Sequence, residues 1–215
     1  ARLVERLLPE ERGSLTDLTG GFGVDFSFLA PLFRNAVYVE RNSDLCEMAQ
    51  HNLPLLGAGH ARVECAQAED FLDGAGQQDL IFLDPARRDD AGRKVVALSD
   101  CSPDVAALSP ALLSRSRVVM VKLSPMLDIG QALLSLHAVR EVHTVSVDGE
   151  CRELLLVLAA GECRPAYHCV NLGRHPQSFV TSERHAQPRI AGAPGQFLYE
   201  PNASILKAGV QDALC

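Results

Sequence analysis

Short runs of apolar, mostly branched residues alternate with stretches of helical periodicity from residue 14 to about residue 160. The runs predict strands, because branched and aromatic side chains fit a pleated, half-buried surface, and the stretches between them predict helices. Strand–helix alternation of this kind predicts a mainly parallel sheet with helices on both faces. The predicted strands are 14–18, 36–40, 61–65, 79–84, 117–123, 141–147 and 153–159, and the predicted helices are 24–33, 44–56, 68–72, 103–114 and 129–138.

The last two predicted strands have no helix between them. Their link begins with Asp148-Gly149, a pair that favours the tight turn of an antiparallel hairpin. A plain dinucleotide-binding fold has six strands, all parallel. The sequence therefore predicts an α/β, doubly wound, mainly parallel seven-stranded Rossmann-like sheet with an antiparallel C-terminal hairpin.

The pattern changes after Gly161. Residues 166–172 and 178–182 resemble short strands, and residues 202–209 resemble a helix start that the chain end cuts short. We therefore expect one domain over residues 1–162 and a small, incomplete α+β appendage over residues 163–215. We expect this appendage to pack as a separate unit with a poorly ordered last helix, and both chain ends resemble those of a fragment.

Composition narrows the classes of protein. Apolar residues make up 47% and charged residues 22%, as in globular domains, and no apolar run is long enough to cross a membrane. The N-terminus lacks the apolar core of a signal peptide, and the seven cysteines contain no Cys-x-x-Cys pair, which indicates reduced thiols and a cytoplasmic protein. Cys163, His168 and Cys169 match no zinc spacing, so we expect no metal. The net charge of −7 leaves only a local patch for contact with a polyanion.

A glycine-rich segment follows the first predicted strand. Residues 17–23 read Asp-Leu-Thr-Gly-Gly-Phe-Gly, and glycines there let the backbone turn tightly and approach a ligand at a helix N-terminus. The third glycine of a dinucleotide fingerprint is replaced by Phe26, which is too bulky for a pyrophosphate. Asp17 precedes the loop instead, and its carboxylate suits a ligand that carries an ammonium and a sulfonium group.

Acidic residues end three further strands. Glu40 lies about 20 residues past the loop, where a carboxylate can accept from both hydroxyls of a ribose. Glu69 or Asp70, after the third strand, can reach an adenine amino group, although either is also a common helix N-terminal charge. Asp84 ends the apolar fourth strand, and Pro85 biases it toward an extended conformation that faces outward.

Together these positions resemble class I S-adenosylmethionine-dependent methyltransferases, over residues 14–160. Residues 84–88, Asp-Pro-Ala-Arg-Arg, with residues 199–202, Tyr-Glu-Pro-Asn, resemble more closely a bacterial RNA methyltransferase group. Its members carry a ferredoxin-like piece and a THUMP-like domain after the catalytic domain and are grouped with cap-guanine-N2 methyltransferases. The resemblance implies that residues from about 166 onward begin the ferredoxin-like piece.

The resemblance also implies roles for individual residues. The cofactor would be S-adenosyl-L-methionine, held by Asp17, Thr19, Gly21, Gly23, Glu40, Arg41, Glu69, Asp70 and Asp84. The catalytic residues would be Asp84, Pro85 and Lys122, and the substrate-binding residues Arg87, Arg88 and Ser124.

The expected reaction is methyl transfer to RNA, with an exocyclic base amine such as guanine N2 as the acceptor. Hydrogen bonds from the amine to Asp84 would localise its lone pair for attack. Amine-methylating relatives have an aromatic residue where Arg87 stands, and an arginine there can stack on a base or hold a phosphate. Arg88, Arg93 and Lys94 add positive charge to the same loop, partly offset by Asp89 and Asp90, and the alternative to a phosphate contact is a solvated loop with internal ion pairs.

Two alternatives to amine methylation of RNA are a small-molecule or protein methyltransferase and a non-catalytic RNA-binding module of the same fold. Uracil-C5 methylation is disfavoured because no cysteine follows the fifth strand at residues 122–125. The sequence does not specify the oligomeric state.

Overall fold

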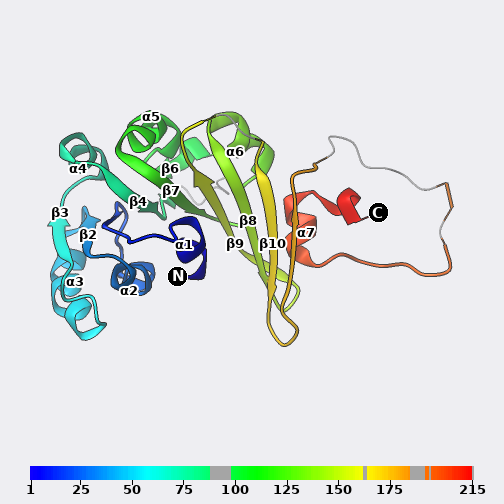
Figure 1. Ribbon diagram of the computed structural model, residues 1–215, viewed down its shortest axis with the longest axis horizontal. Coiled ribbons are helices and arrows are strands. Elements are labelled where there is room, and N and C mark those ends of the chain that lie inside the picture. The colour runs from blue at the N-terminus through cyan, green and yellow to red at the C-terminus, as the bar shows by residue number, and fades with distance from the viewer. Residues whose placement is uncertain (88–97, 162–163, 185–191, 194, 215) are drawn as a thin grey trace.

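The computed structural model describes residues 1–87, 98–161, 164–184, 192–193 and 195–214. In this part of the chain one large sheet has the strand order β11-β10-β8-β9-β7-β4-β1-β2-β3 (Figure 1). Its strands are β1 (Ser14–Asp17), β2 (Asn35–Glu40), β3 (Arg62–Cys65), β4 (Gln78–Leu83), β7 (Ser116–Leu123), β8 (Val139–Val147), β9 (Glu150–Leu158), β10 (Ala166–Leu172) and β11 (Gln177–Thr181). A separate short ribbon pairs β5 (Ala86–Arg87) with β6 (Cys101–Ser102).

Helices cover both faces of the sheet, as Figure 1 shows. The apolar side chains of α1 (Arg2–Leu7), α2 (Val24–Leu29) and α3 (Ser43–Leu55) pack on one face, where Leu80 and Phe82 of β4 are buried. On the other face α4 (Ala68–Gly74), α5 (Val105–Arg115), α6 (Ile129–Ser135) and α7 (Ala203–Ala208) pack with Ile81 and Leu83. A strand covered on both sides needs a continuous apolar run, which explains the sequence of β4. Short 3-10 helices lie at Ala30–Leu32, Leu98–Asp100 and Gln211–Leu214.

Strands β1, β2, β3, β4 and β7 run parallel, and β9 runs antiparallel to both of its neighbours. Asp148 and Gly149 have φ values of 49° and 80°, so the β8–β9 turn has the left-handed conformation that an Asp-Gly pair favours. The doubly wound, mainly parallel sheet with its antiparallel hairpin is therefore confirmed. The chain leaves β1 in one direction and returns to β4 on its other side. The carboxyl ends of these strands thus form the switch point at which such sheets bind ligands.

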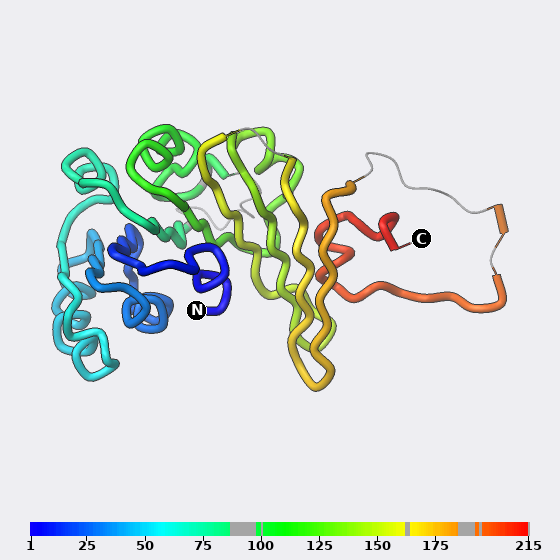
Figure 2. The backbone as a smooth tube through the Cα atoms, in the orientation of Figure 1, coloured from blue at the N-terminus to red at the C-terminus, as the bar shows by residue number. Residues whose placement is uncertain are grey.

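The predicted separate packing of residues 166–215 is wrong, and the sheet has nine strands instead of seven. Strand β10 pairs in parallel with β8, and β11 pairs with β10, so the yellow and orange strands of Figure 2 lie beside the green part of the sheet. Tyr167 and Cys169 of β10 are buried with Ile205 of α7, and Thr144 Oγ1 donates to the Ser204 carbonyl at 2.8 Å. The open edge of β8 accepts another strand, and this non-local pairing leaves no local pattern in the sequence.

The last helix also differs from its prediction. It begins at the Asn202 cap, whose side chain accepts from the Ser204 amide, and it ends at Gly209 with a φ of 67°. A glycine in the left-handed conformation is a common helix terminator, so the helix ends at this residue and not at the end of the chain. The assignment of residues 163–215 to a ferredoxin-like piece stays a prediction.

Neither α1 nor the β5–β6 ribbon was predicted, because both are too short for a clear periodic pattern. Among the described residues, no helix combines the length and the apolar character needed to cross a membrane.

Candidate active site

The glycine loop between β1 and α2 is held against the sheet. Gly21 and Gly23 have φ values of 53° and 75°, which side-chain-bearing residues rarely adopt. Gly20 lies on the ring of Tyr38 from β2, where an added Cβ would be 2.2 Å from Cε2. The Tyr38 hydroxyl donates to the Gly21 carbonyl. The loop conformation is therefore set by its own glycines and by the neighbouring strand.

Gly20→Ala is expected to destabilise the fold by about 1–3 kcal/mol, the usual cost of overpacking a filled site. The new methyl would force the Tyr38 ring or the loop backbone to move. Urea unfolding of this variant and of Gly76→Ala, where an added Cβ meets nothing within 4 Å, measures the difference. Equal stabilities for the two variants would contradict the packing described.

Glu40, at the carboxyl end of β2, connects the loop to the next helix. Its Oε2 accepts from the Gly21 amide at 3.0 Å, and its Oε1 accepts from the Asn42 amide at 2.9 Å. Asn42 in turn caps α3. Each carboxylate oxygen has a second lone pair, so these contacts leave acceptor capacity for a ligand. Glu40 thus occupies the position that the sequence analysis gave it, and it also orders the loop.

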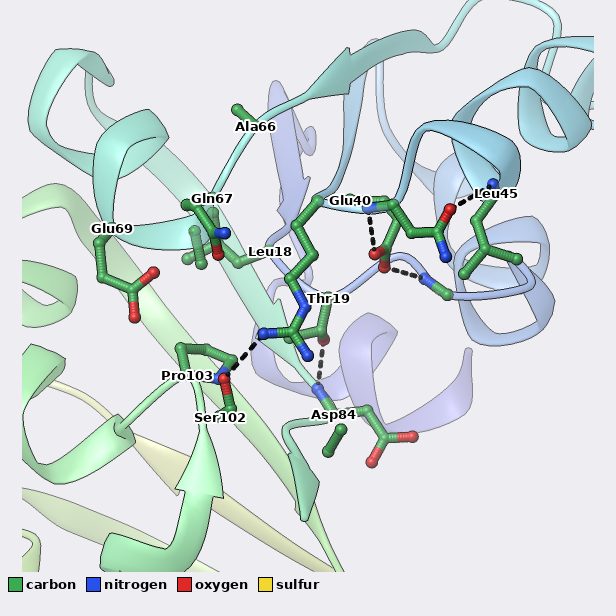
Figure 3. A pocket seen from close by; sticks show the side chains of 15 residues that line it. Leu18, Thr19, Glu40, Leu45, Ala66, Gln67, Glu69, Asp84, Ser102 and Pro103 are labelled. Carbon is green, nitrogen blue, oxygen red and sulfur yellow. Dashed lines mark hydrogen bonds between the residues drawn. The ribbon is translucent and has the colours of Figure 1, made fainter. Parts of the chain in front are cut away.

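A cavity of about 310 Å³ opens at this end of the sheet (Figure 3). Its volume lies within the range of small-molecule sites. Arg41 spans it and donates to Ser102 Oγ at 3.3 Å. The cavity is lined by Leu18, Thr19, Gly21, Glu40, Arg41, Asn42, Leu45, Ala66, Gln67, Ala68, Glu69, Asp84, Ala86, Ser102 and Pro103.

Six predicted cofactor residues line this cavity, whereas three do not. Gly23 is the cap of α2, Asp70 lies exposed on α4, and Asp17 is buried. Gln67, Ser102 and Pro103 also line the cavity and were not predicted, the last two because they follow a stretch with no periodic pattern. The six that line it are Thr19, Gly21, Glu40, Arg41, Glu69 and Asp84.

A second cavity of about 300 Å³ adjoins the first. Asp84 and Ala86 line both cavities, so the end of β4 forms their common wall. A group bound in one cavity can therefore approach a group bound in the other beside Asp84. The second cavity is lined by Asp84, Pro85, Ala86, Cys101, Lys122, Leu123, Ser124, Pro125, Leu127 and Glu153.

Lys122 of β7 joins two carboxylates at this wall. Its Nζ lies 2.7 Å from Asp25 Oδ2 and 2.8 Å from Asp84 Oδ2. Burial opposes its charge, but the hydrogen bonds to Asp25 and Asp84 outweigh burial and raise the Lys122 pKa above its usual range. The ammonium therefore keeps its proton at neutral pH and cannot serve as a general base. Its geometry instead fixes the orientation of Asp84.

Asp17 braces the loop from the interior. Its Oδ1 accepts from the Thr19 amide at 2.9 Å and from Thr19 Oγ1 at 3.3 Å, and Thr19 Oγ1 accepts from the Asp84 amide at 2.6 Å. Burial raises the pKa of Asp17 to about 7. The charges of neighbouring carboxylates raise this pKa further, whereas the hydrogen bonds from Thr19 lower it. Asp17 thus connects, through Thr19, the glycine loop to the end of β4 at Asp84. It does not line the first cavity.

Three carboxylates act on the Lys122 ammonium: Asp25 and Asp84 are hydrogen-bonded to it, and Glu153 interacts with it electrostatically. Asp25 and Asp84 act electrostatically on both Asp17 and Glu153, and burial raises the pKa of Glu153 as well. The group carries more negative than positive charge when its acids ionise, so it favours a cationic ligand. Asp25 and Glu153 were not predicted as site residues, because nothing near them in the chain shows that α2 and β9 meet Lys122.

The predicted RNA-contacting residues are only partly described. The backbone of Arg87 belongs to β5 and pairs with Cys101 of β6. Arg88, Arg93 and Lys94 lie outside the described residues. Ser124 lines the second cavity, and its role as a substrate contact stays a prediction.

Comparison with known proteins relates the fold to solved structures. No family model matches the chain, and no curated protein sequence does. The crystal structure of a "putative methyltransferase" from Porphyromonas gingivalis W83 is 32% identical, with a TM-score of 0.79 over 96% of this chain. The chain spans about half, 53%, of that protein.

Two more distant structures share the fold. The N-terminal domain of human METTL16 in complex with SAH is 14% identical, with a TM-score of 0.55, over 75% of this chain and 68% of that one. An rRNA methylase from Streptococcus thermophilus is 12% identical, with a TM-score of 0.53, over 73% of this chain and 94% of that one. The fold is that of the Rossmann-like methyltransferases.

Proposed function

We propose that the chain is an S-adenosylmethionine-dependent methyltransferase. The observation that carries the proposal is the pair of adjoining cavities with Asp84 in their common wall. A methyl transferase needs a donor site and an acceptor site that meet at one point, since positioning supplies most of the rate. The 32% identity to the Porphyromonas gingivalis protein over nearly the whole chain supports the same reading.

The residues of the first cavity fit this cofactor. Glu40 offers carboxylate oxygens to the two ribose hydroxyls, and the loop amides near Gly21 can meet other polar groups. The excess of carboxylates around Lys122 suits the ammonium and sulfonium charges. When bound, the cofactor supplies an electrophilic methyl group on sulfur. The protein's own residues hold the two reactants in place and orient the acceptor.

Asp84 is the residue that we assign to the acceptor. Its carboxylate, fixed by Lys122, can accept a hydrogen bond from an N–H group of an exocyclic base amine in the second cavity. This hydrogen bond would localise the amine lone pair on the nitrogen, on the side that faces the methyl group of the cofactor. Pro85 restrains the backbone next to Asp84, and Ser124 can contact the base. RNA as substrate, and an amine such as guanine N2 as acceptor, belong to this proposal.

The test is to incubate the purified chain with tritiated S-adenosylmethionine and with RNA from cells that lack the protein. We expect radioactive methyl groups in the RNA, and mass spectrometry of its nucleosides should show one N-methylated base. Label in a small molecule or protein fraction, with none in RNA, would replace the RNA assignment with that substrate class. No transfer to any fraction, despite cofactor binding, would favour a binding module.

Glu40→Ala is expected to weaken cofactor binding by about 1–3 kcal/mol, roughly a 5- to 150-fold rise in Kd. The variant loses the proposed ribose contact and the hydrogen bond that Glu40 accepts from the Gly21 amide. Calorimetric titration with S-adenosylhomocysteine measures the effect, and Glu47→Ala, an exposed acid on α3, is the control. Equal affinity in both variants would remove Glu40 from the cofactor site.

Arg87→Ala is expected to weaken RNA binding at low salt and to reduce the slope of log Kd against log salt by about one. Loss of a phosphate contact changes the slope of log Kd against log salt. Loss of a stacking contact changes the affinity but leaves this slope unchanged. Fluorescence anisotropy over a range of salt concentrations measures both, with Arg152→Ala on the β8–β9 hairpin as the control. An unchanged slope would remove the phosphate role of Arg87.

A further inference from the structure

Glu141, His143 and His168 gather on one face of the sheet, away from both cavities. Glu141 and His143 lie two residues apart on β8 and so share a face. His168 on β10 is the direct parallel partner of His143. The pairing of β8 with β10 therefore brings together three potential metal ligands whose spacing in the sequence does not match a metal-binding motif.

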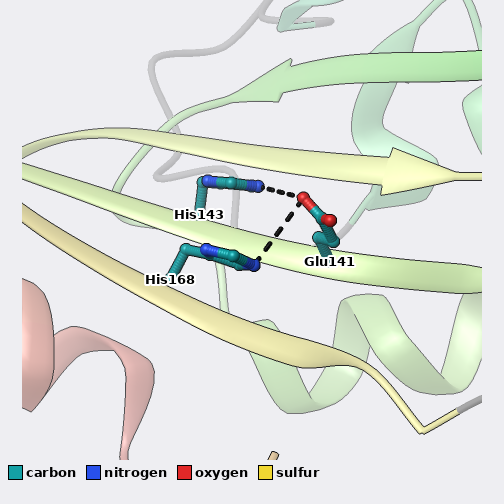
Figure 4. Close-up of side chains that lie close together, drawn as sticks. All are labelled: Glu141, His143 and His168. Carbon is teal, nitrogen blue, oxygen red and sulfur yellow. Dashed lines mark hydrogen bonds and ion pairs between the residues drawn. The ribbon is translucent and has the colours of Figure 1, made fainter. Parts of the chain in front are cut away.

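The ligand atoms converge on one point. Glu141 Oε2 lies 2.7 Å from His143 Nε2 and 3.7 Å from His168 Nε2, and all three atoms lie within 4.8 Å of one another. Figure 4 shows both rings directing Nε2 toward the carboxylate. The rings are stacked, with centroids 4.4 Å apart and planes 13° apart. A metal held at about 2.0–2.1 Å keeps its ligand atoms about 3.0–3.5 Å apart. Shifts of about an ångström or less would bring the three to such spacing.

Hydrogen bonding within the trio does not account for its arrangement. His143 is within hydrogen-bond distance of the carboxylate, whereas His168, at 3.7 Å, is beyond it. The second imidazole nevertheless points at the same oxygen. The side chains are 8% (His143), 15% (Glu141) and 18% (His168) exposed, so all three are largely withdrawn from water without being fully buried.

We propose that Glu141, His143 and His168 bind one divalent transition-metal ion, with water in the remaining coordination positions. Two imidazole nitrogens and one carboxylate oxygen are ligands that zinc accepts readily, and cobalt can substitute for it. The ion would connect β8 to β10 and so fix the outer strands to the rest of the sheet.

Arg6 of α1 supports the carboxylate from its other side. Its Nη1 donates to Glu141 Oε1 at 3.0 Å, and Nη2 donates to Oε2 at 2.5 Å. Each carboxylate oxygen has two lone pairs, so Oε2 retains one that faces the histidines. Outer hydrogen-bond partners of this kind commonly orient a metal-binding carboxylate. The alternative is that the trio and Arg6 form only a polar network without an ion.

Titration of chelator-treated, tag-free protein with zinc chloride in a calorimeter distinguishes the two. We expect one equivalent to bind and the melting temperature to rise with zinc. His143→Gln and His168→Gln should each weaken binding more than about 100-fold, beyond the effect of losing an outer partner. His51→Gln, an exposed histidine on α3, should bind as the unchanged chain does.

Cobalt absorption provides a readout that does not depend on the variants folding. One equivalent of Co²⁺ should give the intense visible bands of a four- or five-coordinate site, abolished by an added equivalent of zinc. The weak spectrum of hydrated cobalt, or zinc binding that is equal in His168→Gln and His51→Gln, would overturn the proposal. Neither outcome bears on methyl transfer, because the trio lies outside both cavities.

Discussion

Asp84→Ala is expected to lower methyl transfer by about 100-fold or more while cofactor affinity changes only a few-fold. Asp84 lies at the common wall of the two cavities, and its carboxylate is fixed by Lys122 at 2.8 Å. Its removal takes away the acceptor that orients the attacking amine and leaves Glu40 in place. Single-turnover rates and calorimetric cofactor affinities, measured on the same preparations, separate the two effects.

Two further variants sharpen this prediction. Asp84→Asn keeps an acceptor oxygen, so it should retain more activity than Asp84→Ala. If Lys122 acts by positioning Asp84, adding Lys122→Ala to Asp84→Ala should cause little further loss, because the two changes affect one interaction. Asp73→Ala, an exposed acid on α4, should be fully active. Normal turnover in Asp84→Ala would remove its catalytic assignment.

Asp17→Asn is expected to stabilise the cofactor-free protein at pH 8 and to leave its stability unchanged near pH 4. The folded-state pKa of Asp17, about 7, lies above the ordinary value of 3.8, so the folded form holds a proton that the unfolded form releases. The stability from Asp17 is therefore present below about pH 4 and is lost as the pH rises toward 7. Asparagine is neutral throughout and can still accept from the Thr19 amide.

The expected gain at pH 8 is at most roughly 4 kcal/mol, from a shift of about three pKa units at 1.36 kcal/mol each. Urea unfolding between pH 4 and pH 8.5 measures it. Asp79→Asn should behave in the opposite way. Although burial favours the neutral acid, hydrogen bonds from Gly13, Ser14 and Arg117 lower the Asp79 pKa. Its contribution is present at neutral pH and is lost in acid. A difference between Asp17→Asn and the unchanged chain that does not vary with pH would contradict the account of Asp17.

The same residue links stability to binding. A cation bound near Asp17 would favour its ionised form, so cofactor affinity should fall as the pH drops below about 7. Asp17→Asn should bind more weakly at pH 8 and lose this dependence. The buried acid would then lower the stability of the empty protein while favouring a positively charged ligand.

The parts of the site that could be predicted from sequence are those set by local chain geometry. A strand followed by glycines defines the loop at Gly21, and strand ends carry Glu40 and Asp84 to one edge of a parallel sheet. The placement of these residues can be predicted because it depends only on where each one lies along its own strand. The fold class could be predicted for the same reason, since alternating periodicities are local.

The parts that could not be predicted depend on contacts between distant segments. Asp25 meets Lys122 across 97 residues of sequence, and no pattern near either one shows the pairing. The edge of β8 gives no sign that β10 will join it, and so the convergence of His143 with His168 could not be foreseen. The burial of Asp17 likewise depends on how the loop packs and not on its place in the motif.

Calorimetric titration of the purified chain with S-adenosylmethionine, S-adenosylhomocysteine and NAD tests the central claim most directly. The account predicts that the first two bind one to one in the cavity beside Glu40, with affinity that falls in Glu40→Ala, and that NAD does not bind. Binding of NAD with no binding of S-adenosylmethionine or S-adenosylhomocysteine would contradict it.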